Sequence, residues 1–162
     1  MSGISATCGL LCSACSVFIA TNEDPERLKR ISLKFGIPEE EVRCFGCRSD
    51  KRFGPCGGCL FSACAKEKGI AFCSDCNDFP CQALSDFQAA LPHRLDLWED
   101  LEKARQLEPL EWISNVGKKY TCPGCGTINS AYDLSCRKCG RTPSCEFVER
   151  HMEALKKHMG LK

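Results

Sequence analysis

The sequence predicts a mostly α-helical, loop-rich fold, in which a small helical domain is followed by a cysteine module and a terminal helix. Sixteen cysteines occur among 162 residues. Twelve of them form Cys-x-x-Cys pairs: Cys12/Cys15, Cys44/Cys47, Cys56/Cys59, Cys73/Cys76, Cys122/Cys125 and Cys136/Cys139. Two residues between thiolates allow one tight turn to direct both sulfurs at a single ion. Amphipathic segments between the clusters indicate helices, so we expect a metal-stabilised helical fold.

The compartment is predicted from the cysteine content together with the N-terminus. Such a chain is either a disulfide-stapled secreted domain or a reduced, metal-loaded protein. The apolar stretch within residues 1–20 has no Lys or Arg before it and is interrupted by cysteines, which argues against an export signal. No apolar run reaches the roughly 20 residues of a membrane span. We therefore expect a cytoplasmic protein with bound Zn²⁺ and no membrane association.

The first predicted domain covers residues 1–117 and its first half contains two expected helices. Asp24 is a suitable N-cap followed by Pro25, and Gly36 is expected to end that helix. Residues 38–42 contain three consecutive glutamates and predict a further helical turn. From residue 44 to 59, four glycines and Pro55 predict irregular, ligand-bearing loops.

Four further helices are expected before residue 118. One covers 61–68 and ends at Gly69, a second follows Cys81, a third carries apolar residues over 95–104, and a fourth begins at Pro109. Each has apolar residues on one face. We interpret these faces as the core of the helical domain.

The second predicted unit, residues 118–162, contains the most specific motif. Cys122-Pro-Gly-Cys125-Gly and Cys136-Arg-Lys-Cys139-Gly are two zinc knuckles separated by residues 126–135. A glycine after the second cysteine can adopt the left-handed conformation that directs amides toward sulfur. Residues 120–121 and 127–128 favour short strands. The motif predicts a zinc ribbon whose four sulfurs leave no coordination position open for catalysis.

Five basic residues surround this ribbon against a single acidic one: Lys118, Lys119, Arg137, Lys138 and Arg141. Nucleic-acid-binding ribbons use such charge, often with an exposed aromatic residue, and Tyr120 could serve. A few basic residues are more often simply solvated. Three loaded four-cysteine sites would also change the formal charge of +1 to about −5. A nucleic-acid-binding accessory role is therefore an alternative that would depend on a local surface.

The closing segment predicts an amphipathic helix with Thr142 as its cap and Pro143 in its first turn. Its apolar residues repeat at coiled-coil spacing: Val148, Met152, Leu155 and Met159. We expect this stripe to dock on the helical domain, although a partner or a second copy could also cover it. Cys145 is interpreted as a spare thiol packed at the start of the helix.

The metal in the first domain has to be inferred from the spacing of its cysteines. Cys8-x3-Cys12-x2-Cys15 has the spacing of the four-iron site in radical S-adenosylmethionine enzymes, but a chain this short cannot supply their barrel. The spacing of bacterial ferredoxins is also missing. Zinc is the simpler interpretation, with an iron–sulfur cluster of another kind as the minor alternative.

Ten cysteines of this domain are candidate ligands in addition to the four of the ribbon: Cys8, Cys12, Cys15, Cys44, Cys47, Cys59, Cys64, Cys73, Cys76 and Cys81. They suffice for two further four-sulfur sites, giving about three zinc ions in total. Spacing alone does not decide which half-sites combine. Leftover thiols such as Cys8 or Cys81 are either buried structural groups or members of a redox site.

Four motifs occur together in order: Cys8-Gly-Leu-x-Cys12-x2-Cys15, Cys44-x-Gly-Cys47-Arg, Cys59-x4-Cys64-Ala-Lys-Glu-Lys-Gly and Phe72-Cys73-x2-Cys76-x2-Phe-Pro-Cys81. In this combination, over roughly residues 6–117, the chain resembles a cysteine-rich prokaryotic family known as domain of unknown function 3795, some of whose members carry a terminal zinc ribbon. The resemblance implies a small cytosolic zinc-binding protein of a bacterium or archaeon and no particular activity. Cys56 fits the family pattern least well, so Cys64 is expected to be the companion of Cys59.

Little in the sequence indicates catalysis. The three histidines are too scattered for a mixed Cys/His catalytic site, and no phosphate-binding or hydrolase motif occurs. We therefore favour a non-enzymatic scaffold that binds another macromolecule, either protein or nucleic acid, as a monomer or weak homodimer. The main alternative is a redox or metal-handling protein with labile thiolates or an iron–sulfur cluster.

Overall fold

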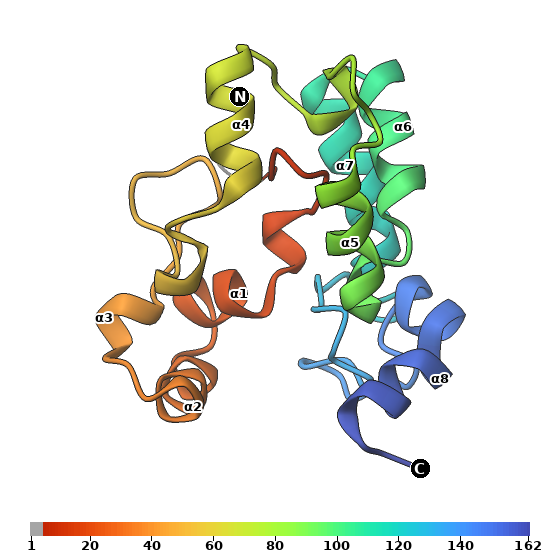
Figure 1. The fold of residues 1–162 in the computed structure, drawn as a ribbon. Coiled ribbons are helices and arrows are strands. Elements are labelled where there is room, and N and C mark those ends of the chain that lie inside the picture. Colours follow the sequence, from red (N-terminus) through yellow and green to blue (C-terminus); the bar gives the residue numbers. More distant parts are fainter. Residues whose placement is uncertain (1–4) are drawn as a thin grey trace.

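The protein is built mostly of short helices, and no β-strand occurs between residues 5 and 162. These are the residues that the computed structural model describes (Figure 1). The α-helices are α1 (Ser16–Asn22), α2 (Pro25–Phe35), α3 (Glu39–Val42), α4 (Leu60–Lys68), α5 (Gln82–Ala90), α6 (Leu97–Gln106), α7 (Pro109–Tyr120) and α8 (Glu146–Met159). Four 3-10 turns connect them: η1 (Cys12–Ala14), η2 (Gly54–Cys56), η3 (Cys73–Asp75) and η4 (Pro92–Arg94). The predicted helical fold class is confirmed.

The predicted boundaries of α2 are confirmed in detail. The Asp24 carboxylate accepts a hydrogen bond from the Arg27 backbone N–H at 2.9 Å, which satisfies one of the free amides at the helix start. Pro25 occupies the first turn, and Gly36 ends the helix in the left-handed conformation with φ 65°. Leu28 on this helix is buried in a small core with residues of α1, α3 and the following loop: Ala20, Val42, Cys44 and Phe53.

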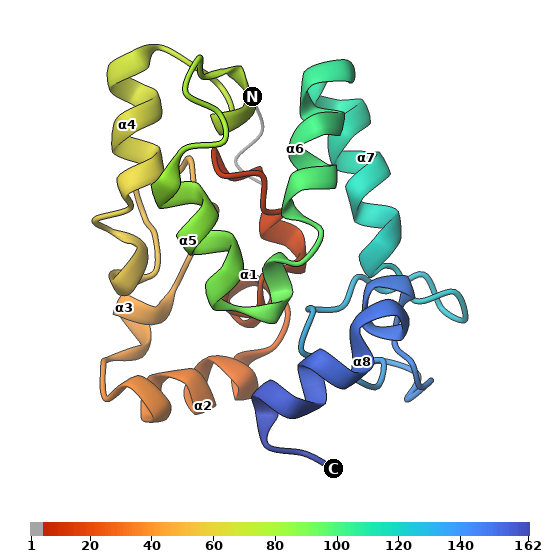
Figure 2. The same cartoon turned by 45° about the vertical axis from the view of Figure 1, so that its right-hand side comes forward.

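A larger core joins the N-terminal loop to helices α5–α8. Figure 1 and Figure 2 show α5 between α4 on one side and the pair α6 and α7 on the other. Trp112 of α7 is fully buried, its ring centroid lies 5.1 Å from that of Phe72, and its Nε1–H donates to the Asp100 carbonyl at 2.7 Å. At the other end of α7, Tyr120 stacks on Phe147 of α8 at 5.1 Å. This core therefore contains residues from both sides of the boundary predicted at residue 117, and the division into two domains stays a prediction.

Helix α8 docks within the chain, as expected from its apolar stripe. Val148 and Leu155 are fully buried, and α8 packs on α7 and η4. The predicted cap was wrong, because α8 begins at Glu146 and Cys145 occupies the N-cap position. The physical reason is that the backbone before Cys145 hydrogen-bonds to the ribbon segment and not within a helix. The Ser144 N–H donates to the Leu134 carbonyl at 3.0 Å.

Buried charges connect the terminal unit to the helical one. Lys119 of α7 pairs with Asp96 at 3.2 Å and with Asp100, and all three side chains are nearly inaccessible to solvent. Asp96 also contacts His151 of α8 at 2.7 Å and Arg150 at 3.3 Å. Because burying these charges is unfavourable unless they are paired, the network stabilises one arrangement of α6, α7 and α8.

Replacing Gly9 should destabilise the fold more than replacing an exposed glycine. Gly9 has φ 90°, and a Cβ there would lie 2.7 Å from Cγ of the fully buried Leu101. We expect Gly9→Ala to lower the free energy of unfolding by roughly 2–4 kcal/mol, since backbone strain and overpacking add. The matched control is Gly36→Ala, which has φ 65° and open space and should cost only about 1 kcal/mol. Urea denaturation measures both, and equal losses would contradict the close approach of Leu101.

Removing the Lys119 charge should leave two buried carboxylates without their cation. We expect Lys119→Met to cost roughly 3–5 kcal/mol, whereas Lys118→Met, at an exposed neighbouring position, should stay within about 0.5 kcal/mol. Burial already raises the pKa of Asp100 to about 6, despite the opposing effect of Lys119.

A carboxyl whose pKa is raised by folding takes up its proton more readily in the folded state, so low pH relieves the uncompensated charge. The loss of unfolding free energy in Lys119→Met should therefore be largest above about pH 6. It should shrink as the pH falls toward the ordinary pKa of aspartate. Thermal unfolding of both variants across this pH range checks it. A loss of stability that does not depend on pH would show that Lys119 does not compensate the charge of the Asp100 carboxylate.

Candidate metal centre

The four cysteines of the predicted ribbon form a cage of sulfurs in the segment between α7 and α8. The Sγ atoms of Cys122, Cys125, Cys136 and Cys139 all lie within 4.8 Å of one another. The Cys122–Cys139 and Cys125–Cys136 sulfur distances are both 3.6 Å. Zinc–sulfur bonds of about 2.3 Å in a tetrahedron place sulfurs about 3.8 Å apart. This cluster could therefore hold one tetrahedral metal ion without rearrangement.

Each knuckle is shaped by a tight backbone turn. Gly126 N–H donates to the Cys122 carbonyl and Gly140 N–H to the Cys136 carbonyl, both at 2.9 Å. Both glycines have the predicted positive φ, 71° and 74°. The predicted strands at residues 120–121 and 127–128 were wrong, because Tyr120 is the last residue of α7. Only an isolated bridge between Thr121 and Ile128 pairs these segments in the described chain.

Asn129 contacts the sulfur cage through hydrogen bonds of its side chain. This residue was not singled out in the sequence. Its fully buried side chain accepts from the Arg137 backbone N–H at 3.0 Å and donates to Cys136 Sγ at 3.6 Å. Desolvation acts to raise the pKa of Cys136, but hydrogen bonds from the backbone of Cys139 and Lys138 lower it to about 6. The backbone thus stabilises a thiolate, which is the form that binds metal.

The basic residues around the ribbon are largely engaged inside the protein. Lys119 is buried in the network with Asp96 and Asp100, and the Arg137 guanidinium pairs with Glu23. Tyr120 is 6% exposed and stacked on Phe147, so the expectation that it could stack on a base was wrong. The exposed remainder is Lys118, Lys138 and Arg141. These residues do not form the combined basic and aromatic surface that the nucleic-acid interpretation required.

A second group of thiols lies around α1 and the loop after α3. The Cys47 N–H donates to Cys12 Sγ at 3.3 Å, and the contact with the Cys12 thiol, together with burial, raises the pKa of Cys47. Desolvation of its sulfur, with the nearby Cys44 and Cys47 thiols, raises the pKa of Cys15 to about 11. The predicted half-sites Cys12/Cys15 and Cys44/Cys47 are therefore neighbours in space, although spacing could not pair them.

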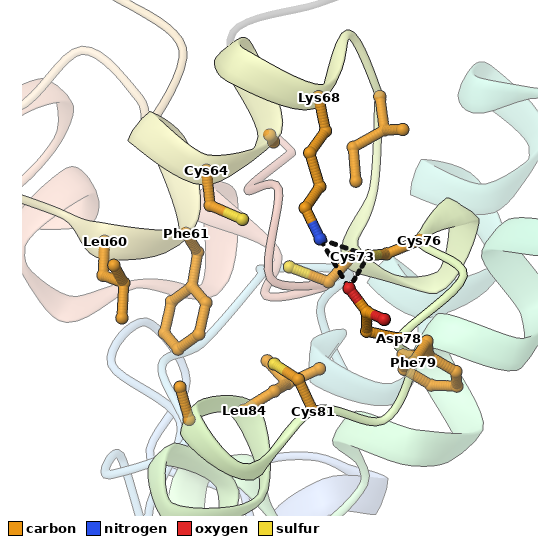
Figure 3. Close-up of a pocket in the computed structure, with 13 residues that line it drawn as sticks. Leu60, Phe61, Cys64, Lys68, Cys73, Cys76, Asp78, Phe79, Cys81 and Leu84 are labelled. Atoms are coloured by element: carbon orange, nitrogen blue, oxygen red, sulfur yellow. Dashed lines mark hydrogen bonds and ion pairs between the residues drawn. The ribbon is translucent and has the colours of Figure 1, made fainter.

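A third group of thiols lines a cavity of about 280 Å³ between α4, η3 and α5 (Figure 3). Four cysteines contribute to its wall: Cys64, Cys73, Cys76 and Cys81. Burial, followed by the neighbouring thiols of Cys81 and Cys64, raises the pKa of Cys73 to about 12. Lys68 of the same wall was not singled out in the sequence, although its spacing of one helical turn from Cys64 was a usable signal.

The remaining cysteines of the first unit lie beside these groups. Cys8 is buried, and desolvation, with the thiols of Cys47, Cys59 and Cys73 nearby, raises its pKa to about 12. Cys56 is exposed and does not line the cavity. Within residues 5–162, only the ribbon brings three or more Cys, His, Asp or Glu ligand atoms within 4.8 Å of one another. The ligand roles of the ten cysteines of the first unit thus stay predictions.

Two of the histidines have structural partners. His93 Nδ1 lies 2.7 Å from the Tyr132 hydroxyl, and burial lowers the pKa of His93 to about 4. His151 Nε2 lies 2.7 Å from an Asp96 oxygen. Neither is adjacent to the sulfur cage or the cavity lining.

Comparisons with known proteins identify the family but no activity. No helix among residues 5–162 combines the length and apolar character needed to cross a bilayer. No curated protein and no solved structure matches the chain. Residues 4–86 match a family described as protein of unknown function (DUF3795). This range includes both thiol groups of the helical unit, the one around α1 and the one that lines the cavity. The chain therefore belongs to the DUF3795 family, as the ordered cysteine motifs predicted.

Proposed function

We propose that the protein is a non-enzymatic zinc-binding scaffold of the prokaryotic cytoplasm, in which the ribbon is a structural zinc site. The observation that carries this proposal is the cage of four sulfurs, each within 4.8 Å of the others. A tetrahedral ion held by four thiolates has no open position for substrate or water, so its contribution is to stability rather than to chemistry.

The position of the cage supports a structural purpose. It lies between α7 and α8, which share the Tyr120–Phe147 stack and the buried charges of Lys119 and Asp96. Between the two knuckles, Asp133 accepts two hydrogen bonds from Arg27 of α2, at 2.9 and 3.2 Å. A metal ion that fixes the ribbon would therefore also fix the orientation of the helices that contact it.

The exposed apolar side chains of α2 and α4 favour a protein as the binding partner. Leu33 and Phe35 of α2 and Leu60 of α4 are large apolar side chains with half or more of their surface exposed. Residues of this kind contribute to protein interfaces. Of the groups that the nucleic-acid interpretation used, Lys119, Arg137 and Tyr120 are engaged in internal contacts. We infer that the monomer, or a weak homodimer, presents its helical surface to another protein.

A redox or metal-handling role is the second candidate, and one observation favours it. Four thiols of the helical unit surround an open cavity instead of forming a closed cage. Thiolates in such a position remain accessible to a metal or an oxidant.

The structural zinc site is tested by exchanging its exposed ligand Cys139. We expect Cys139→Ser to lose one equivalent of zinc and to unfold at a lower temperature, because a hydroxyl does not replace the thiolate ligand. Cys139→His should retain that zinc, since three cysteines and one histidine also form structural sites. Metal analysis by mass spectrometry and thermal unfolding measure both variants.

The matched control for this experiment is Cys145→Ala, which removes a buried thiol beside the ribbon but outside the cage. It should leave the zinc content unchanged. Full zinc retention in Cys139→Ser would refute the proposed site.

A further inference from the structure

The cavity between α4, η3 and α5 collects thiols from three separate segments of the chain. Cys64 comes from the middle of α4, Cys73 begins η3, Cys76 follows it, and Cys81 precedes α5. Figure 3 shows Cys64, Cys73 and Cys81 directed toward the same space. Four cysteines that converge on one cavity from separate segments are the donor set of a metal centre, and spacing alone did not assemble it.

The dimensions of this group differ from those of the ribbon in the same chain. In the ribbon, the four sulfurs lie within 4.8 Å of one another, close to the roughly 3.8 Å that a single zinc ion requires. No three of the cavity thiols come this close. The volume of this open cavity, about 280 Å³, is many times the roughly 10–15 Å³ that one water molecule needs on the same measure. The cavity therefore has room for a polynuclear centre, and its sulfurs are not gathered around one point as those of the ribbon are.

The lining of the cavity matches such a centre chemically. Apart from the thiols, it is mostly apolar, with side chains that include Phe61, Phe79 and Leu84. Lys68 is a positively charged residue that lines the cavity. Its Nζ donates to Cys76 Sγ at 3.1 Å and pairs with the Asp78 carboxylate at 2.8 Å. Iron–sulfur clusters are held by four cysteine thiolates, and hydrogen bonds to the sulfurs tune their potentials.

We propose that Cys64, Cys73, Cys76 and Cys81 bind an iron–sulfur cluster in this cavity, with Lys68 as a hydrogen-bond donor to one of its sulfur ligands. This centre is separate from the ribbon and does not depend on zinc being bound there. Cys12, Cys15, Cys44 and Cys47 are not part of it and remain a separate group of thiols.

The first experiment measures iron, sulfide and zinc in the full chain, purified without oxygen and reconstituted with ferric iron, sulfide and dithiothreitol as the reductant. We expect iron and sulfide in equal amounts, with a broad charge-transfer absorption in the visible range. The variant Cys73→Ser/Cys81→Ser should lose both, while the zinc of the ribbon stays. The matched control, Cys56→Ser, removes an exposed thiol outside the cavity and should retain the full absorption.

Either of two results would overturn the proposal: a colourless reconstituted protein that takes up zinc in place of iron, or absorption that persists in the double variant. Zinc and iron are measured in the same sample, so loss of the ribbon site and absence of the cluster are recognised independently.

A second experiment uses a variant that spares the ligands. Lys68→Met removes a positive charge and an N–H donor next to Cys76, so the reduction potential of the cluster should become more negative. Lys66→Met removes an exposed charge from the same helix, outside the cavity wall, and should leave the potential nearly unchanged. Electrochemical titration followed by electron paramagnetic resonance measures both. Identical potentials for the two variants would show that Lys68 does not contact the bound centre.

Discussion

The close packing of many cysteine thiols in partly buried positions is the constraint on which the structure of the protein depends. The fold brings cysteines from distant segments into contact, and in the helical unit burial and neighbouring thiols raise the pKa values of Cys8 and Cys73 to about 12. Such sulfurs can ionise together only when a cation neutralises them. In the ribbon, the backbone amides behind Cys136 already favour its thiolate form. The four sulfurs of the ribbon are placed so that one ion could neutralise them, whereas metal binding by the thiols of the helical unit stays a prediction.

The ribbon and the helical unit depend on each other through contacts that no metal provides. Helix α7 carries Trp112 into the main core at one end and leads directly into the first knuckle at the other. Lys119, one residue before the end of that helix, is buried between the carboxylates of Asp96, which precedes α6, and Asp100 of α6. The same residue that the sequence presents as part of a basic surface is therefore an internal cation. For this reason the residues that lead into the ribbon are packed against the helical unit.

The sulfur cage of the ribbon and the thiols of the cavity differ in what fixes the positions of their cysteines. The ribbon knuckles are local turns whose geometry is fixed by a few backbone hydrogen bonds, such as that from Gly126 to Cys122. The cavity thiols come from α4, the η3 segment and the residue before α5, so their positions depend on how these segments pack together. A closed cage suits one structural ion, whereas an apolar cavity with four separated sulfurs suits a larger centre.

The sequence by itself determined the features that local chemistry controls. The cap at Asp24, the stop at Gly36 and the two knuckles of the ribbon each depend on a few adjacent residues, and all were predicted. Only the tertiary structure decided which half-sites face one another, because Cys12 and Cys47 meet through packing between distant segments. It likewise buried Lys119 and Tyr120, since a charge or an aromatic ring shows its environment only after α6, α7 and α8 have packed.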